Sequence, residues 1–211
     1  MKKIAFVALL LTTQAFANEE KSSQPAVFMG SMSLENQKYT DLTVKGEATL
    51  KTIEAKTITL YGQSQMDGIK AQKLMSYGPL SISNSQLTDI HVNGPAEIAG
   101  TTILGSVQIA GPALTYSSKF KGAVQIEGDL ECFGSAFEKL LTLRGQNSQF
   151  KEVAIKKIKV LKPTQQNSSP QTIVLIGVDV AYIEFESGKG IVKADKKSTI
   201  GKIVGGKIIR E

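Results

Sequence analysis

Seven glycines recur along the chain at intervals of 16 or 17 residues, and this spacing constrains the fold more than any other feature. They are Gly46, Gly62, Gly78, Gly94, Gly111, Gly128 and Gly145. The residue four positions before each glycine is always aliphatic. This column consists of Leu42, Ile58, Leu74, Ile90, Val107, Val124 and Leu141. An aliphatic residue at a fixed offset through every interval indicates a repeat protein with one structural unit per interval.

Three further columns keep an apolar character at fixed offsets from the glycines. Two positions before lie Val44, Leu60, Ser76, Val92, Ile109, Ile126 and Leu143, with Ser76 as the exception. Four positions after lie Leu50, Met66, Ile82, Ile98, Thr115, Cys132 and Gln149. Nine positions after lie Ala55, Ala71, Leu87, Ile103, Phe120, Phe137 and Ala154. We expect each column to form a continuous rib in one interior.

The residues between these columns are mostly polar, so apolar and polar residues alternate with the period of a half-buried strand. Each alternating stretch is short and then changes parity, which indicates a corner. The sequence therefore predicts an all-β fold, a single-stranded parallel β-solenoid with three-sided coils of about 16–17 residues. The glycines suit corners, and Pro79, Pro95 and Pro112 follow three of them, where a residue without an N–H interrupts the ladder.

Two other architectures fit the pattern less well. The turns of a β-sandwich typically recur every 8–12 residues, and its strands would not keep one aliphatic column through every repeat. A helical repeat is excluded because alternation with period two cannot place the apolar residues on one helical face.

The coils are expected over residues 39–162. Residues 18–38 are interpreted as a flexible leader whose apolar patch, Ala26 to Met29, forms a strand that caps the first coil. Lys162 replaces the next glycine, and the composition of residues 163–171 predicts a loop. Residues 172–211 are predicted to form further strands that extend or cap the solenoid.

The N-terminus has the three parts of a secretory signal peptide. Lys2 and Lys3 precede an apolar run from Ile4 to Leu11, and the stretch ends in the cleavage pattern Ala15-Phe16-Ala17. Residues 1–17 are therefore predicted to be removed, which places the protein in the periplasm, outside the cell or on its surface. No later stretch is long and apolar enough for a membrane span, which predicts that the protein is not an integral membrane protein.

Several coils contain a V-x-G type corner. These are Leu42-Thr43-Val44-Lys45-Gly46, Ile90-His91-Val92-Asn93-Gly94 and Val124-Gln125-Ile126-Glu127-Gly128. With stacked coils of this length, they resemble bactofilins and the polymer-forming β-helical proteins grouped with them. The resemblance implies the solenoid fold and self-association by end-to-end stacking. Bactofilins are mostly cytoplasmic, so the predicted export of this chain departs from their pattern.

The sequence predicts no catalytic residue, no cofactor site and no metal site, and hence no enzyme. His91 is the only histidine, and a metal site needs several ligands. Cys132 shares a column with aliphatic residues and is expected to be buried. The alternative is a carbohydrate-binding or carbohydrate-active β-helix protein. Its candidate residues are an outward strip of Glu127, Asp129, Glu131 and Arg144, because glycosidases need paired carboxylates.

Charge is distributed unevenly and bears on the partners. Residues 18–150 contain 11 basic and 13 acidic residues, whereas residues 151–211 contain 12 basic and 6 acidic residues. Only Phe150, Tyr182 and Phe185 accompany the second set of lysines, so a stacking surface for nucleic acid is not indicated. We expect an exported structural or interaction protein of the cell envelope. Its expected partners are further copies of itself, bound end to end or laterally, or an envelope polysaccharide.

Overall fold

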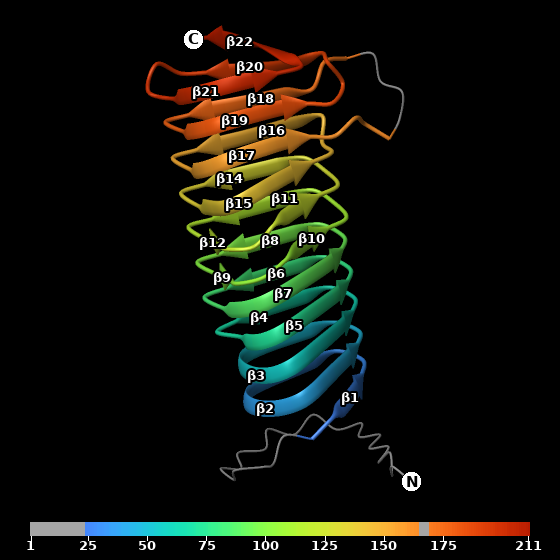
Figure 1. The fold of residues 1–211 in the computed structure, drawn as a ribbon. Coiled ribbons are helices and arrows are strands. Elements are labelled where there is room, and N and C mark those ends of the chain that lie inside the picture. The colour runs from blue at the N-terminus through green and yellow to red at the C-terminus, as the bar shows by residue number, and fades with distance from the viewer. Residues whose placement is uncertain (1–23, 165–168) are drawn as a thin grey trace.

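The computed structural model describes residues 24–164 and 169–211, and within these ranges the chain forms strands and no helix. Its 22 strands belong to one sheet system that winds through about 11 turns. Strands of successive turns pair in parallel. The fold is therefore the predicted parallel β-solenoid (Figure 1). The predicted signal peptide, residues 1–17, lies outside the described residues.

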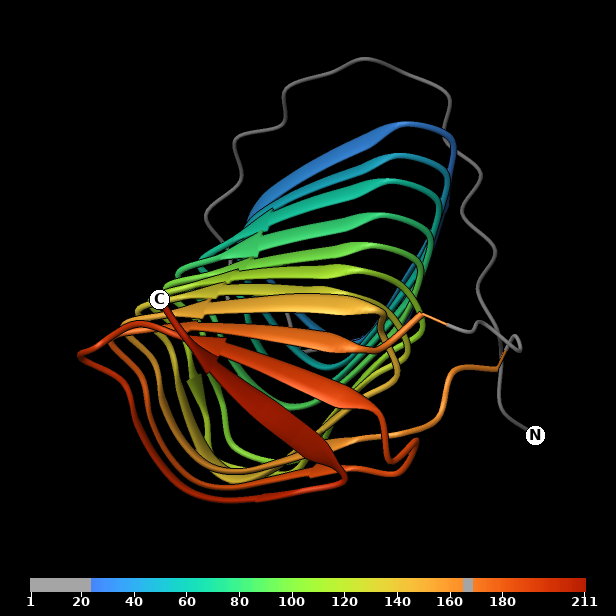
Figure 2. The same cartoon turned by 90° about the horizontal axis from the view of Figure 1, so that it is seen from above.

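Each complete turn has three straight sides. The turn made by β10 (Val107–Ile109), β11 (Ala113–Tyr116) and β12 (Lys119–Phe120) has one strand on each side. We call these sides face A, face B and face C, in this order. Each face is a parallel sheet that runs along the stack, and the three sheets enclose one interior (Figure 2). Side chains that point inward from all three faces therefore share a single core.

The pairing register places the other strands on these faces. Face A also contains β1 (Ala26–Met29), β13 (Val124–Ile126) and the last parts of the long strands β2 (Met32–Lys45), β3 (Ala48–Tyr61), β5 (Lys70–Tyr77), β7 (Gln86–Asn93), β15 (Ala136–Leu143), β17 (Ala154–Val160), β19 (Asp179–Phe185) and β21 (Thr199–Val204). Face B also contains the first parts of β2 and β3 and the strands β4 (Ser64–Asp67), β6 (Leu80–Ser83), β8 (Ala96–Ala99), β14 (Leu130–Phe133), β16 (Asn147–Lys151), β18 (Thr172–Ile176), β20 (Gly190–Ala194) and β22 (Gly206–Arg210). Face C also contains β9 (Thr102–Ile103) and the parts of the long strands that precede face A.

The interior is filled by the aliphatic columns of the sequence. All seven residues four positions before the glycines are buried, and they stack in register, as Ile90, Val107 and Val124 do. The second column on face A is buried as well, including its one polar member, Ser76. Burial of every side chain of a column removes continuous apolar surface from water along the whole stack.

Two residues that the sequence analysis assigned to core columns do not lie in the core. Gln149 is half-buried and Ala154 is exposed, whereas the next residues, Phe150 and Ile155, are buried. Phe150 pairs with Cys132, one position later than a 17-residue turn would place it. The extra residue lies in the corner before β16, where no apolar column marks the change of register.

The change from 16-residue to 17-residue turns takes place at the corner between faces C and A. Leu87 and Ile90, the core residues on the two sides of this corner, are three positions apart, whereas their counterparts in the next turn are four apart. Gly105 and Gly122 lie in the enlarged corners of two successive turns. A Cβ atom on Gly122 would lie 1.7 Å from the carbonyl oxygen of Gly105. The enlarged corner therefore brings the two backbones too close together for any side chain.

The predicted column of glycines lies at the corner between faces A and B, where successive backbones also meet closely. A Cβ atom on Gly62 would lie 2.6 Å from the carbonyl oxygen of Gly46, and one on Gly128 would lie 2.5 Å from that of Gly111. Real Cβ atoms do not approach backbone oxygens this closely, so only glycine fits. Gly30, which the sequence analysis did not include, begins this column below Gly46.

Buried hydroxyl groups line the corner between faces B and C. They belong to Ser85, Thr101, Ser118 and Ser135. The Ser118 hydroxyl accepts a hydrogen bond from the backbone N–H of Thr101 at 3.2 Å and donates one to the carbonyl oxygen of Tyr116 at 2.8 Å. The other three repeat this pattern. Each hydroxyl satisfies backbone groups that the corner removes from the regular ladder. This ladder was not predicted from the sequence, although its members are 16 or 17 positions apart.

The stack extends on both sides of residues 39–162. β1 pairs with the last part of β2, so the segment interpreted as a cap forms the first side of the first turn. After Val160 the chain leaves the stack and returns at Thr172, and β18 to β22 add further turns (Figure 1). Gln171 fixes the return, because its buried side-chain amide donates hydrogen bonds to the carbonyl oxygens of Gly145 and Leu161.

Candidate functional site

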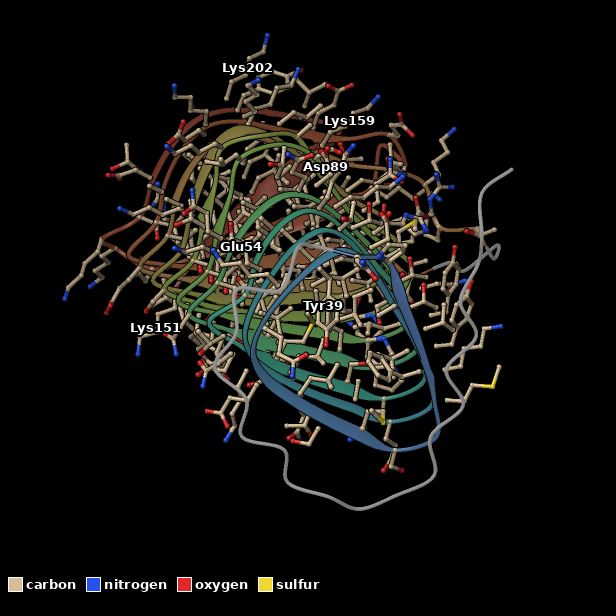
Figure 3. The ribbon with its side chains drawn as sticks, turned by 90° about the horizontal axis from the view of Figure 1, so that it is seen from below. Tyr39, Glu54, Asp89, Lys151, Lys159 and Lys202 are labelled. Carbon is tan, nitrogen blue, oxygen red and sulfur yellow. The ribbon has the colours of Figure 1, made fainter. Side chains whose placement is uncertain are left out.

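The N-terminal end of the stack presents core residues that the described part of the chain covers incompletely. These residues are Ala26, Phe28, Met32 and Tyr39, which pack against the core and are only partly buried. Figure 3 views the stack from this end. The rings of Phe28 and Tyr39 contact each other edge to face, with 6.3 Å between their centroids. Burial raises the pKa of the Tyr39 hydroxyl, and the Tyr39 ring packs against the core.

The C-terminal end has the same character. Ile208 stands in the same column as Val192, which is fully buried, yet Ile208 is 41% exposed because the described residues place no turn above it. Ile200 and Ile203 of β21 are likewise only partly buried against the core. The aliphatic columns therefore continue to the last turn and end at an open surface.

Arg210 covers one corner of this C-terminal end. Its guanidinium group donates hydrogen bonds to the carbonyl oxygens of Asp195 at 3.0 Å and Ser198 at 2.8 Å. These contacts satisfy backbone groups between faces B and C. Ile203 on face A is only partly buried and Ile208 on face B is exposed.

Both ends also carry strand edges without a partner in the described residues. β1 pairs only with β2, and β22 pairs only with β20. At the N-terminal end the outer edges belong to β1 on face A and to β2 on faces B and C. At the C-terminal end they belong to β21 on faces A and C and to β22 on face B. Unpaired edges are templates for strand addition, and here the two ends carry matching sets.

The two ends differ in charge. Residues 24–47, which form the first turn, contain two basic and three acidic residues. Residues 188–211, which form the last turn, contain seven basic and two acidic residues. Two C-terminal ends would repel each other, whereas a C-terminal end and an N-terminal end would not.

In the acidic strip predicted from the sequence, Glu127 and Asp129 make contacts within the chain. The Glu127 carboxylate lies 2.6 Å from Nε of Arg144, which fixes both side chains on neighbouring turns. The Asp129 carboxylate accepts hydrogen bonds from the backbone N–H groups of Gln146 and Asn147 at 2.6 and 2.8 Å. Asp129 therefore holds the corner that leads into β16. Glu131 is exposed on face B, away from this corner.

His91 lies on the outer surface of face A, as its position between Ile90 and Val92 predicts. Its Nδ1 atom is 3.2 Å from the Oε1 atom of Gln108 on the next turn. It borders a shallow open depression of about 320 Å³ that also adjoins Asp89 and Ser106. The Asp89 carboxylate accepts hydrogen bonds from the hydroxyl and the backbone N–H of Ser106, both at 2.7 Å. These contacts connect neighbouring turns at the enlarged corner.

The hydrogen bonds to Asp89 predict how stability depends on pH. They favour the ionised form and, with nearby Lys73, lower the pKa of Asp89. The stabilisation is therefore present above the ordinary carboxyl value of about 3.9 and is lost as the pH falls towards the lower pKa of the folded state. We expect the urea midpoint of the Asp89→Asn variant to fall less between pH 5 and pH 3 than that of the parent protein. Identical pH profiles would show that Asp89 does not contribute.

Cys132 is fully buried on the inner side of face B, as predicted. Burial raises the pKa of its thiol, and hydrogen bonds with Thr115 and Ser135 oppose this shift without reversing it. The Thr115 hydroxyl lies 3.0 Å from the sulfur atom. A buried neutral thiol is a weak nucleophile, which agrees with a packing role for Cys132.

Stacked aromatic pairs on the outer surface bear on carbohydrate binding. Tyr61 and Tyr77 on face A are partly exposed, and their rings stack with centroids 4.9 Å apart and planes 10° apart. Tyr116 and Phe133 on face B form a similar pair, with centroids 5.3 Å apart. In each pair, one face of each ring is covered by the other ring. The broad aromatic face that would stack on a sugar or a base is thus partly occupied.

Comparisons with protein-family models, curated proteins and solved structures gave no significant match. Within residues 24–164 and 169–211, no helix is long and apolar enough to cross a lipid bilayer. In the same part of the chain, no three side chains of His, Cys, Asp or Glu are grouped closely enough to hold a metal ion.

Proposed function

We propose that this chain is an exported structural protein of the cell envelope, a rigid β-solenoid scaffold that assembles with further copies end to end. The observation that carries the proposal is Ile208, which continues a fully buried column and yet is 41% exposed at the last turn. Phe28 and Tyr39 present the matching apolar surface at the first turn. Covering such surface and pairing the free edges are favourable together.

The strand arrangement supports a head-to-tail contact. When the first turn of one copy sits on the last turn of another, β1 meets the edge of β21 on face A, and the first part of β2 meets β22 on face B. All three parallel sheets then continue across the junction. The charges of the ends favour the same orientation, because two C-terminal ends repel. A head-to-tail contact of this kind leaves one free end at each step and generates filaments.

Export is part of the proposal and rests on the composition of residues 1–17. The basic start, the apolar run and the Ala15-Phe16-Ala17 pattern support it. The carbohydrate alternative has less support, because Glu127 and Asp129 are occupied by contacts within the chain and the exposed aromatic rings stack on each other.

Substitutions at the two ends test the proposal. We expect the purified parent protein to form particles in negative-stain electron microscopy that grow with concentration by steps of roughly 50 Å, the length of about 11 turns at a β spacing of ~4.8 Å. Phe28→Lys and Ile208→Lys each place a charge on one end and should each abolish this growth. An equal mixture of the two variants should restore particles at least two lengths long, because one competent end remains on each variant.

The control is Gln65→Lys, which adds the same charge to an exposed side of β4 and should leave filament growth unchanged. Circular dichroism melting of each variant confirms that the stack is intact. If the mixture gave particles of one length only, or if the parent protein remained at one length at all concentrations, end-to-end assembly would be wrong.

A further inference from the structure

The outer surface of face B carries an apolar patch in the C-terminal half of the stack. Its members are Leu114, Tyr116, Phe133, Val174 and Ile176, all of them intermediate or exposed. The equivalent outward positions of β3, β4 and β6, in earlier turns, are polar. They are Thr49, Lys51, Gln65, Asp67, Ser81 and Ser83. An apolar cluster on a sheet surface whose earlier turns are polar indicates a surface that is covered by a partner.

The register orders this surface into two outward columns. From Glu97 onward, the first column is Glu97, Leu114, Glu131, Gln149, Val174, Lys193 and Ile209. The second column is Ala99, Tyr116, Phe133, Lys151 and Ile176. Neighbours in a column are about 4.8 Å apart along the stack. Figure 3 shows Lys151 pointing away from the stack into solvent.

These two columns are self-complementary. Consider a two-fold axis in the plane of the contact, parallel to the strands and midway between β14 and β16. It sets β14 of one copy against β16 of the other, β11 against β18, and β8 against β20. The opposed pairs are then Leu114 with Val174, Tyr116 with Ile176, Phe133 with Lys151, Glu131 with Gln149, and Glu97 with Lys193. In these pairs apolar residues meet apolar residues, a lysine meets an aromatic ring, and Glu97 and Lys193 have opposite charges.

Three other two-fold arrangements of the same surface lose this match. Moving the axis onto β14 sets Glu97 against Val174, and moving it onto β16 sets Glu131 against Val174. An axis along the solenoid sets Glu131 against Phe133. Each of these places a carboxylate on an apolar residue, which removes its water without giving it a partner. The axis between β14 and β16 is therefore favoured by both the apolar and the charged residues.

We infer that two copies of this protein pair laterally through face B, in opposite directions, with β14 of each copy opposite β16 of the other. The apolar pairs on either side of the centre supply the attraction, and the Glu97–Lys193 pairs nearer the rim set the register. Lys193 lies 3.6 Å from the exposed Glu211 within its own chain, a loose contact that it can exchange. This pairing is independent of the proposed end-to-end assembly, because it uses a side of the stack.

Charge reversal tests the pairing, with Ile208→Lys as the background so that the proposed end-to-end growth does not contribute. In this background we expect a dimer by sedimentation equilibrium. Glu97→Lys and Lys193→Glu should each weaken the dimer by about tenfold or more, because each sets like charges against each other twice. An equal mixture of these two variants should form a mixed dimer of near-parental affinity. The double variant should also recover, because it restores opposite charges.

Thr49→Lys on β3 is the matched control, since it adds a charge to face B outside the patch and should not change the dimer. Tyr116→Asp should abolish dimerisation, because it places a carboxylate opposite Ile176. If the mixture of Glu97→Lys and Lys193→Glu formed no more dimer than the two variants form separately, the proposed register would be wrong. A background protein that is monomeric at all accessible concentrations would overturn lateral pairing itself, whatever the result for the ends.

Discussion

Val107→Asp is expected to abolish cooperative folding of the stack. Val107 is 1% exposed in the middle of the aliphatic column on face A, between Ile90 below and Val124 above. A carboxylate at this position has no hydrogen-bond donor or cation in its column, so its burial should cost about 5 kcal/mol or more. Because each turn of a solenoid contacts only its neighbours, a turn that cannot form in the middle also separates the two halves. Thermal and urea unfolding followed by circular dichroism would measure the loss.

The neighbouring residue provides a matched control for this substitution. Gln108 lies next to Val107 in β10 and is exposed on the outer surface. Gln108→Asp introduces the same side chain into the same strand and should cost less than about 1 kcal/mol. A cooperative transition of Val107→Asp at the parental midpoint would show that the column does not point inward.

Gly122→Ala is expected to destabilise the fold by roughly 3 kcal/mol or more, although it adds one methyl group. The added Cβ would lie 1.7 Å from the carbonyl oxygen and 2.3 Å from the carbonyl carbon of Gly105 on the turn below. These are backbone atoms of an enlarged corner, so the clash can be relieved only by separating two turns. Differential scanning calorimetry or urea unfolding should show a lower midpoint.

Gly188→Ala separates this clash from the conformational preference of glycine. Gly188 has a φ of 70°, and no other atom lies within 4 Å of its ideal Cβ position. Its substitution should cost only about 1–2 kcal/mol, from backbone strain alone. If both variants lost the same stability, close contact between the turns at Gly122 would not be the cause.

The interior of the repeated turns could be predicted from the sequence because side chains of stacked turns must match. A polar residue in one turn would lie against apolar residues above and below, so each column is mostly apolar wherever the turn length stays constant. Val107 and Cys132 could be placed inside for this reason. The prediction of Gln149 and Ala154 as core residues was wrong because a residue was added in a corner, and a corner has no side-chain pattern that reports its length.

Glycines could likewise be predicted where they recur in every turn and not where they belong to a single kind of corner. Gly46 and its successors could be recognised because the close approach between faces A and B recurs in every turn of the repeat. Gly105 and Gly122 allow a similar close approach of backbones between faces C and A, but only in the enlarged corners. Two glycines 17 positions apart are too few to form a recognisable pattern. The hydroxyl ladder of Ser118 and its neighbours was missed because serine and threonine are abundant in this chain, and their burial depends on the corner.

The sequence by itself determined the parallel β-solenoid, its three-sided turns and the residues of its main columns, because these follow from local alternation repeated at a fixed interval. Only the tertiary structure decided which surfaces remain open. Exposure of Ile208 and the pairing of Leu114, Tyr116 and Val174 into one patch depend on which turn lies above which and on where the stack ends. These are relations between residues far apart in the chain, and no single repeat contains them.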